Sequence, residues 1–117
     1  MKIFLYDAES DYELQDEELN LEQAMTEFYE LSDIKGSFFG IKNVPKTIQF
    51  AWEEEDKWLV DVLYDMKNFI CLQKYASYDE CVEIIKSLFD GQASDKIEGL
   101  VKVNIMESDL DETLANL

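Results

Sequence analysis

Residues 46–64 read KTIQFAWEEEDKWLVDVLY, and this stretch decides the fold of the chain. Apolar and polar side chains alternate on both sides of its acidic run EEED. The apolar positions are Ile48, Phe50 and Trp52 before the run, and Trp58, Val60 and Val62 after it. A period of two with one apolar face is typical of half-buried β-strands, and a short polar turn between two such strands predicts an antiparallel hairpin. We therefore expect strands over 46–53 and 57–64.

Strands are also expected on both sides of this hairpin. Residues 37–43 and 69–75 extend it into a meander, residues 2–6 form a short strand near the N-terminus, and residues 99–105 form one more near the C-terminus. Short polar connections separate the central four strands, as in successive antiparallel hairpins. The stretch 7–19 lacks a clear apolar period, and we expect it to be an exposed acidic loop.

Two helices have recognisable starts. Asn20 and Ser77 can each cap a helix, with Gln23 and Glu80 in the respective capping-box positions, and Gly91 ends the second helix. Ser108 is expected to cap a short C-terminal helix. The sequence thus predicts a single globular α+β domain over 1–117. It contains an antiparallel sheet of four to six strands, with two main helices packed on it and the short C-terminal helix.

The composition argues against catalysis. The 117 residues carry 27 Asp and Glu against 10 Lys, with no His and no Arg, for a formal net charge of −17. His is the usual proton shuttle and a common metal ligand, and Arg is the residue best shaped to hold an anionic substrate. Their absence removes Ser-His and Cys-His nucleophile pairs, His-bearing zinc sites and Arg clamps. We expect a binding protein with no enzymatic activity and no cofactor.

The acids are concentrated rather than spread. Residues 3–34 contain eleven acids and no base, and a second run is the turn between the two central strands. Like charges this close repel one another, so folding alone gives little reason to place them together. We expect a basic protein partner, and neither nucleic acid nor an anionic membrane surface. The acidic residues expected to bind it are Asp7, Glu9, Asp11, Glu13, Asp16, Glu17, Glu18, Glu22, Glu53, Glu54, Glu55 and Asp56.

Two residues in the central strands add to this candidate interface. Trp52 and Trp58 flank the acidic turn, and cross-strand pairing would bring them together either as core residues or as an aromatic anchor beside a carboxylate rim. We include Trp52 in the predicted binding surface. Asp61 interrupts an otherwise apolar strand, so it either faces solvent or awaits a Lys or Arg of the partner.

One acidic stretch approaches a calcium-loop template. Asp7, Glu9, Asp11, Glu13 and Glu18 fall at its positions 1, 3, 5, 7 and 12. Tyr12 occupies the sixth position, where the sharp turn calls for Gly, and no helix clearly enters the loop. We therefore interpret the stretch as a flexible acidic loop without a metal. Glu53 with Asp61 could form a glycosidase-like acid pair, but solvated hairpin charges are the preferred interpretation.

The two cysteines and the N-terminus indicate a reducing compartment. Cys71 and Cys81 fall at apolar positions of a predicted strand and helix, which favours reduced core residues over a disulfide. The apolar stretch before Asp7 is shorter than the apolar part of a signal peptide, and no run reaches transmembrane length. We expect a cytoplasmic protein.

Residues 37–91 resemble a known family type. The stretches FFGI at 38–41, TIQF at 47–50 and WLVDV at 58–62, followed by a helix from SYDEC at 77–81 to LFDG at 88–91, are similar to bacterial immunity proteins. These are the antidotes of polymorphic or contact-dependent growth-inhibition toxins. The resemblance implies a cytoplasmic monomer that forms a one-to-one complex with a cognate toxin domain, usually a nuclease.

Two other kinds of binding protein fit the same composition. A small acidic secretion chaperone would hold an unfolded segment on exposed apolar patches and should be a homodimer. A nucleic-acid mimic would present regularly spaced carboxylates to a DNA-binding protein in place of a phosphate track. The toxin inhibitor is the preferred interpretation of the three, and regular spacing of the acids on one face would distinguish the nucleic-acid mimic.

Overall fold

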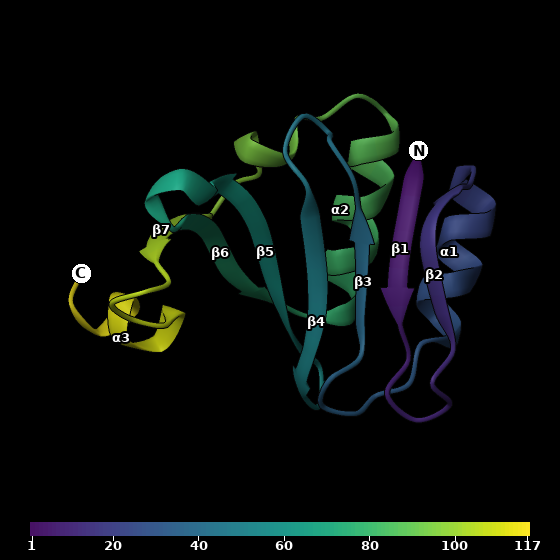
Figure 1. Ribbon diagram of the computed structural model, residues 1–117, viewed down its shortest axis with the longest axis horizontal. Coiled ribbons are helices and arrows are strands. Elements are labelled where there is room, and N and C mark those ends of the chain that lie inside the picture. The colour runs from purple at the N-terminus through teal and green to yellow at the C-terminus, as the bar shows by residue number, and fades with distance from the viewer.

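The computed structural model describes residues 1–117 and is an α+β fold, as the sequence predicts (Figure 1). Its single antiparallel sheet has seven strands: β1 (Lys2–Tyr6), β2 (Glu13–Glu18), β3 (Phe38–Ile41), β4 (Ile48–Glu54), β5 (Lys57–Asp65), β6 (Ile70–Ala76) and β7 (Val101–Asn104). The helices are α1 (Leu21–Glu30), α2 (Tyr78–Phe89) and α3 (Leu110–Ala115), with short 3-10 turns η1 (Met66–Asn68) and η2 (Ser94–Lys96). No helix combines the length and apolar character needed to span a membrane.

The strand order is β2-β1-β3-β4-β5-β6-β7, so the predicted meander from β3 to β6 is confirmed. In the central hairpin, Phe50 pairs with Val60 and Trp52 pairs with Trp58. This register places the alternating apolar side chains of β4 and β5 on one face of the sheet, as the period of two requires.

Helices α1 and α2 cover that apolar face and lie behind the sheet in Figure 1. Phe28 of α1 is buried among Phe39, Phe50 and Trp58 of three different strands, with ring centroids 4.9 to 6.0 Å from its own. Aromatic pairs at these separations add packing energy to the burial of their area. The core is therefore centred under α1 and the β3-β4-β5 part of the sheet.

The predicted starts of the two main helices are confirmed. The Asn20 side chain accepts a hydrogen bond from the Gln23 N–H at 2.8 Å, and the Ser77 hydroxyl accepts one from the Glu80 N–H at 3.2 Å. Both capping boxes are complete, because each N3 side chain also accepts the backbone N–H of its cap. Gly91, with φ +103°, follows the end of α2.

The cap of the C-terminal helix differs by one residue from the expectation. Asp109, not Ser108, caps α3, because its carboxylate accepts the Glu112 N–H at 2.8 Å. The Ser108 hydroxyl instead lies 3.1 Å from that of Thr113. A carboxylate next to the positive end of the helix dipole is at least as good a cap as a hydroxyl.

The expectation of a loop over 7–19 is wrong for residues 13–18, which form strand β2. Its backbone pairs with β1, for example at Leu5 and Leu14, and Leu14 is its only side chain packed against the core. An edge strand needs no alternation when one apolar contact and the backbone pairing hold it. Its exposed carboxylates also discourage pairing with a further strand.

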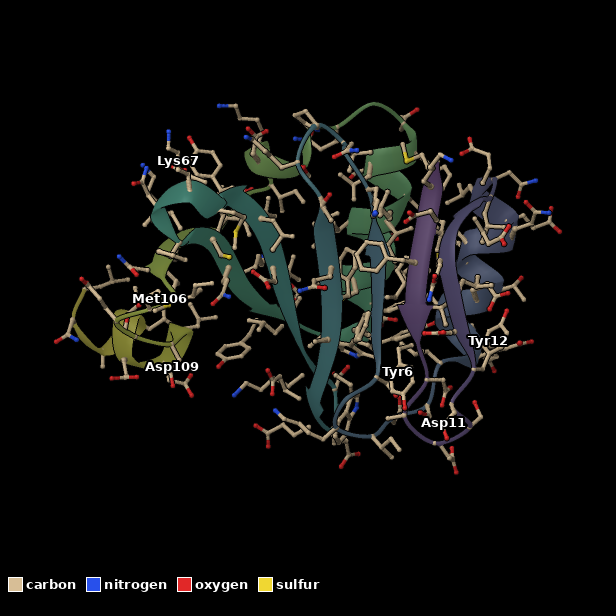
Figure 2. The ribbon with its side chains drawn as sticks, in the orientation of Figure 1. Tyr6, Asp11, Tyr12, Lys67, Met106 and Asp109 are labelled. Carbon is tan, nitrogen blue, oxygen red and sulfur yellow. The ribbon has the colours of Figure 1, made fainter.

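The opposite face of the sheet is covered only at one end. Leu110 of α3 is buried there with Val103 and Cys71, outside the main core. The Tyr75 hydroxyl donates a hydrogen bond to Asp111 of α3 at 2.9 Å. The rest of this face is open to solvent, and Tyr6 stands at its lower edge in Figure 2.

Both cysteines are buried free thiols, as predicted. Desolvation raises the pKa of each to about 12, with the Asp61 carboxylate adding to the shift at Cys71. Cys81 belongs to the core under α2, whereas Cys71 lies on the other face of the sheet under α3. Since the two thiols lie on opposite faces of the sheet, a disulfide between them is ruled out by the fold.

Candidate functional site

Three connections meet at one end of the sheet, the lower end in Figure 1. They are the β1–β2 turn at 7–12, the α1–β3 connection at 31–37 and the β4–β5 turn at 55–56. The Trp52 N–H donates to the Ser37 carbonyl at 3.1 Å, and Lys35 forms an ion pair with Glu53. These contacts join the α1–β3 connection to the central hairpin.

Asp7 joins the same connection to the β1–β2 turn and is not a free acid. Its carboxylate accepts hydrogen bonds from the Ser32 hydroxyl at 2.8 Å, the Ser32 N–H at 2.9 Å and the N–H groups of Glu9 and Ser10 at 3.0 and 3.2 Å. Desolvation alone would raise the Asp7 pKa, but these hydrogen bonds hold it below its ordinary value. The Asp7 side chain is therefore buried and engaged within its own chain, and its place in a partner-binding surface stays a prediction.

Aromatic rings form the inner wall of this end. The Tyr78 ring lies parallel to that of Phe28, with 5.2 Å between centroids and an interplanar angle of 3°. Trp58 lies 4.9 Å from Phe28 and 6.4 Å from Tyr78 by the same measure. Because Phe28 and Trp58 are core residues, the ring of Tyr78 is held in place by packing.

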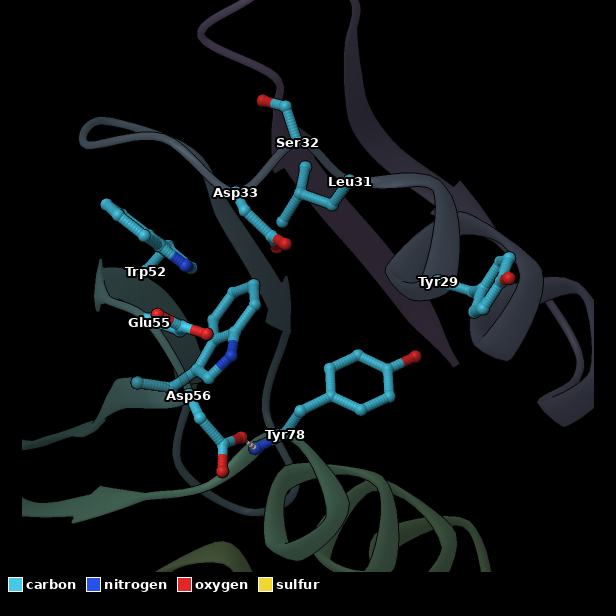
Figure 3. Close-up of a pocket in the computed structure, with 9 residues that line it drawn as sticks. Tyr29, Leu31, Ser32, Asp33, Trp52, Glu55, Asp56 and Tyr78 are labelled. Carbon is cyan, nitrogen blue, oxygen red and sulfur yellow. Dashed lines mark hydrogen bonds between the residues drawn. The ribbon is translucent and has the colours of Figure 1, made fainter.

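A pocket of about 730 Å³ opens beside these rings, between α1, the β4–β5 hairpin and the start of α2 (Figure 3). Trp52, Trp58, Tyr78 and Tyr29 supply its aromatic lining, and Leu31 adds an apolar one. In Figure 3, Trp52 and Tyr78 lie on opposite sides of the pocket, while Tyr29 stands further out on its helix. The volume is in the range of about 300 to 1,000 Å³ that is usual for binding sites.

The rim of the pocket is acidic. Asp33, Glu55 and Asp56 line it, and no basic residue does. The lysines nearest in the chain, Lys35 and Lys57, form ion pairs with Glu53 and Glu54 outside the lining. The pocket thus combines aromatic faces with unopposed negative charge, an environment that attracts cations and disfavours anions.

Asp56 also shapes the pocket. It has φ +50° in the two-residue turn between β4 and β5, a conformation that Asp tolerates better than most residues. Its carboxylate accepts a hydrogen bond from the Tyr78 N–H at 3.0 Å, drawn as a dashed line in Figure 3. This hydrogen bond ties the turn to the first residue of α2. Burial also raises the pKa of the Tyr78 hydroxyl.

The remaining predicted acids do not join this pocket. Glu13, Asp16, Glu17 and Glu18 lie on β2, at the far edge of the sheet, and Glu22 lies in the first turn of α1. Asp16 pairs with Lys42 at 3.0 Å and Glu18 pairs with the N-terminal amine at 2.9 Å. Glu9 and Asp11 are exposed in the β1–β2 turn, where the Tyr6 hydroxyl donates to Asp11. The acids therefore form two surfaces, one at the loop end and one along the β2 edge.

Asp61 lies on the open face of the sheet, the first of the two interpretations that the sequence allows. Its two carboxylate oxygens accept hydrogen bonds from the side-chain amides of Gln49 and Gln73, each at 3.1 Å. These neighbours sit directly opposite Asp61 on β4 and β6. The carboxylate is thus satisfied by hydrogen bonds within its own chain.

The calcium-loop template does not form a site. No group of three or more His, Cys, Asp or Glu side chains is placed to hold a metal ion. Asp7 points inward to Ser32, while Glu13 and Glu18 stand at the two ends of β2. In the acid pair considered for glycoside chemistry, Glu53 is paired with Lys35 and Asp61 with two amides.

The binding surface predicted from the sequence includes only three of the nine residues that line the pocket: Trp52, Glu55 and Asp56. Tyr29 and Asp33 come from α1 and the segment after it, and Tyr78 comes from the first position of α2. Asp33 belongs to the base-free stretch 3–34, which was the one signal that could have included it. Nothing in the local pattern separates Tyr29 or Tyr78 from ordinary helix residues.

Comparison of the chain with protein-family models, with curated proteins and with solved structures gives no match.

Proposed function

We propose that this chain is an immunity-type inhibitor that binds a basic toxin domain, such as a nuclease, at the loop end of its sheet. The observation that carries the proposal is the pocket lined by Trp52, Trp58 and Tyr78, whose charged lining residues are all carboxylates. Aromatic anchors surrounded by polar groups are typical of protein interfaces, and interface energy concentrates on such residues.

The charge of the whole chain supports a basic partner. With 27 acids against 10 Lys, the field of the protein accelerates encounter with a positively charged surface. A nuclease must present basic groups to phosphate, so an acidic protein that covers those groups competes directly with the nucleic acid. Inhibition then needs no catalytic group on this chain.

In the family type that the chain resembles, the antidote is encoded beside its toxin, so the proposal is tested by co-expressing the chain with the product of the adjacent upstream gene. We expect a one-to-one complex, relief of the growth arrest that the partner causes alone, and an association rate that falls steeply as salt is added. A partner whose toxicity is unchanged by this chain would contradict the proposal.

A matched pair of variants locates the interface. Asp33→Asn with Glu55→Gln removes two charges from the pocket rim, whereas Asp90→Asn with Glu107→Gln removes two exposed charges elsewhere. Asp90 follows the C-terminal end of α2, whereas Tyr78 begins that helix. We expect only the rim pair to slow association and to weaken protection.

A second candidate function is a secretion chaperone, and one observation favours it. Met66, Phe69, Ile105 and Met106 are exposed apolar residues around η1 and the end of β7, where the Ile105 N–H donates to the Phe69 carbonyl. Light scattering on the purified chain separates the two functions, because the inhibitor is expected to be monomeric and the chaperone dimeric. A dimer that Met106→Glu dissociates would favour the chaperone.

A further inference from the structure

The chemistry of the pocket is specific enough to indicate what enters it. Trp52 and Tyr78 face the cavity from two sides, and Asp33, Glu55 and Asp56 bring three carboxylates from two separate connections. The negative face of an aromatic ring attracts a cation within about 6 Å of its centroid. A cation that reaches this pocket meets rings and carboxylates together, without a competing lysine among the lining residues.

We propose that the pocket receives an arginine side chain of the partner protein, whose guanidinium lies against the aromatic lining and pairs with the rim carboxylates. Arginine fits better than lysine for three reasons. Its planar group stacks on aromatic faces, and it forms two parallel hydrogen bonds with a carboxylate. It is also less strongly hydrated than an ammonium group, so it loses less on entering a partly dry pocket.

The pocket is organised before any partner arrives. Tyr78 is stacked on the buried ring of Phe28, and its backbone is fixed by the hydrogen bond to Asp56. Trp52 is held opposite Trp58 by the register of the central hairpin. A site whose side chains are already ordered does not lose their rotamer entropy on binding, which favours affinity.

The inference depends on the proposed function for the nature of the partner, but the chemistry of the pocket can be tested alone. The chain has two Trp residues, and both line the pocket. Intrinsic tryptophan fluorescence therefore reports on this site and not on the acidic edge along β2. The probe is a tetra-arginine peptide, with tetra-citrulline as its uncharged counterpart and tetra-lysine as its equally charged one.

We expect tetra-arginine to change the tryptophan emission in a saturable way at low salt. Tetra-citrulline should have no effect, and tetra-lysine should bind at least several-fold more weakly. Equal effects of tetra-arginine and tetra-lysine, or a response to tetra-citrulline, would overturn the proposal.

Charge-removing variants distinguish binding in the pocket from attraction to the overall negative charge of the chain. Asp33→Asn with Glu55→Gln should weaken tetra-arginine binding by about fivefold, as expected for two partly exposed ion pairs. The control pair Asp90→Asn with Glu107→Gln has the same net charge and should bind as the unchanged chain does. If both double variants weakened tetra-arginine binding equally, the peptide would respond only to net charge, and the proposal would be overturned.

Removing an aromatic wall tests the ring contribution. Trp52→Ala should weaken tetra-arginine binding by about five- to tenfold, measured by the shift of the remaining Trp58 emission or by calorimetry. Trp52 is half-buried, so circular dichroism must show the same secondary structure, and Trp52→Phe should retain most of the affinity. Undiminished binding by a folded Trp52→Ala chain would contradict the inference.

The two proposals fail in different ways. If the chain neutralises its partner but tetra-arginine does not bind, the arginine pocket is wrong and the inhibitor remains. If tetra-arginine binds the pocket but the adjacent gene product is not neutralised, the pocket remains and the inhibitor is wrong.

Discussion

The carboxylate of Asp56 accepts a hydrogen bond from the backbone N–H of Tyr78 at 3.0 Å, and this bond joins the β4–β5 turn to the start of α2. The N–H belongs to the first turn of the helix, where backbone donors lack partners within the helix. Asp56 therefore acts as a cap from a distant part of the chain, in addition to the local cap by Ser77.

This bond leads to a stability prediction. Asp56→Ala should lower the free energy of unfolding by about 1 to 2 kcal/mol, because it removes the acceptor and places Ala at φ +50°. Asp56→Asn keeps an acceptor and tolerates the positive φ, so its loss should be about half as large. Urea denaturation measures both, with Glu55→Ala as the neighbouring control that should change little.

A second prediction concerns the contribution of the Asp7 carboxylate to stability at low pH. Its pKa is lowered in the folded chain, so the unfolded state binds the proton more readily. The stability from this carboxylate is therefore fully present above its ordinary pKa of 3.8 and is lost as the pH falls through the lower, folded value. Asp7→Asn should cost about 2 kcal/mol at pH 7, since the amide cannot accept from Ser32 and both nearby N–H groups.

The quantity to measure against pH is the difference in unfolding free energy between the unchanged chain and the Asp7→Asn variant. Acid also relieves the repulsion among the other carboxylates, which opposes the loss at Asp7. The gap in unfolding free energy between the unchanged chain and Asp7→Asn should be constant from pH 7 to 5 and narrow below about pH 4. A gap that stays constant down to pH 2 would show that the Asp7 carboxylate is not stabilised in the folded state.

Local signals predicted the central part of the fold. The alternation from Ile48 to Val62 needs only the pleat of a strand, and the boxes at Asn20 and Ser77 need only four residues each. The physical cause of each pattern lies in residues that are close together in the sequence. For that reason the hairpin, its register and both main helix starts could be predicted correctly.

The remaining features of the fold and of the site could not be predicted, because they depend on contacts between residues far apart in the sequence. Strand β2 has no alternation because it is an edge strand held by pairing with β1, and Asp7 is buried by Ser32, which lies 25 residues away. Tyr29 and Asp33 line the same pocket as Trp52 only because α1 packs across the sheet. Charge counting found the acidic turn at 53–56 but cannot distinguish an acid used inside the fold from one that faces a partner.

The buried thiols give a third prediction. Cys71 and Cys81 should react with a disulfide reagent at pH 8 only when urea unfolds the chain, because burial raises both pKa values to about 12 and blocks access. The folded state favours the neutral thiols, so their stability contribution is complete below the ordinary pKa of 9.0 and is lost as the pH rises from there to about 12. A Ser10→Cys variant, exposed in the β1–β2 turn, supplies the positive control.

The last prediction concerns Gly40, where the ring of Phe4 occupies the space that a side chain would need. A Cβ atom at Gly40 would lie 2.0 to 2.4 Å from atoms of the Phe4 ring on the neighbouring strand. Gly40→Ala should therefore destabilise the chain by about 2 to 3 kcal/mol, since the ring must leave its place on the open face of the sheet. In a Phe4→Ala background the same substitution should cost less than about 1 kcal/mol, because the obstructing ring is gone. Urea denaturation of the four chains measures this coupling. If Gly40→Ala were equally costly with and without the Phe4 ring, its effect would come from the backbone of β3 and not from the packing of the two residues.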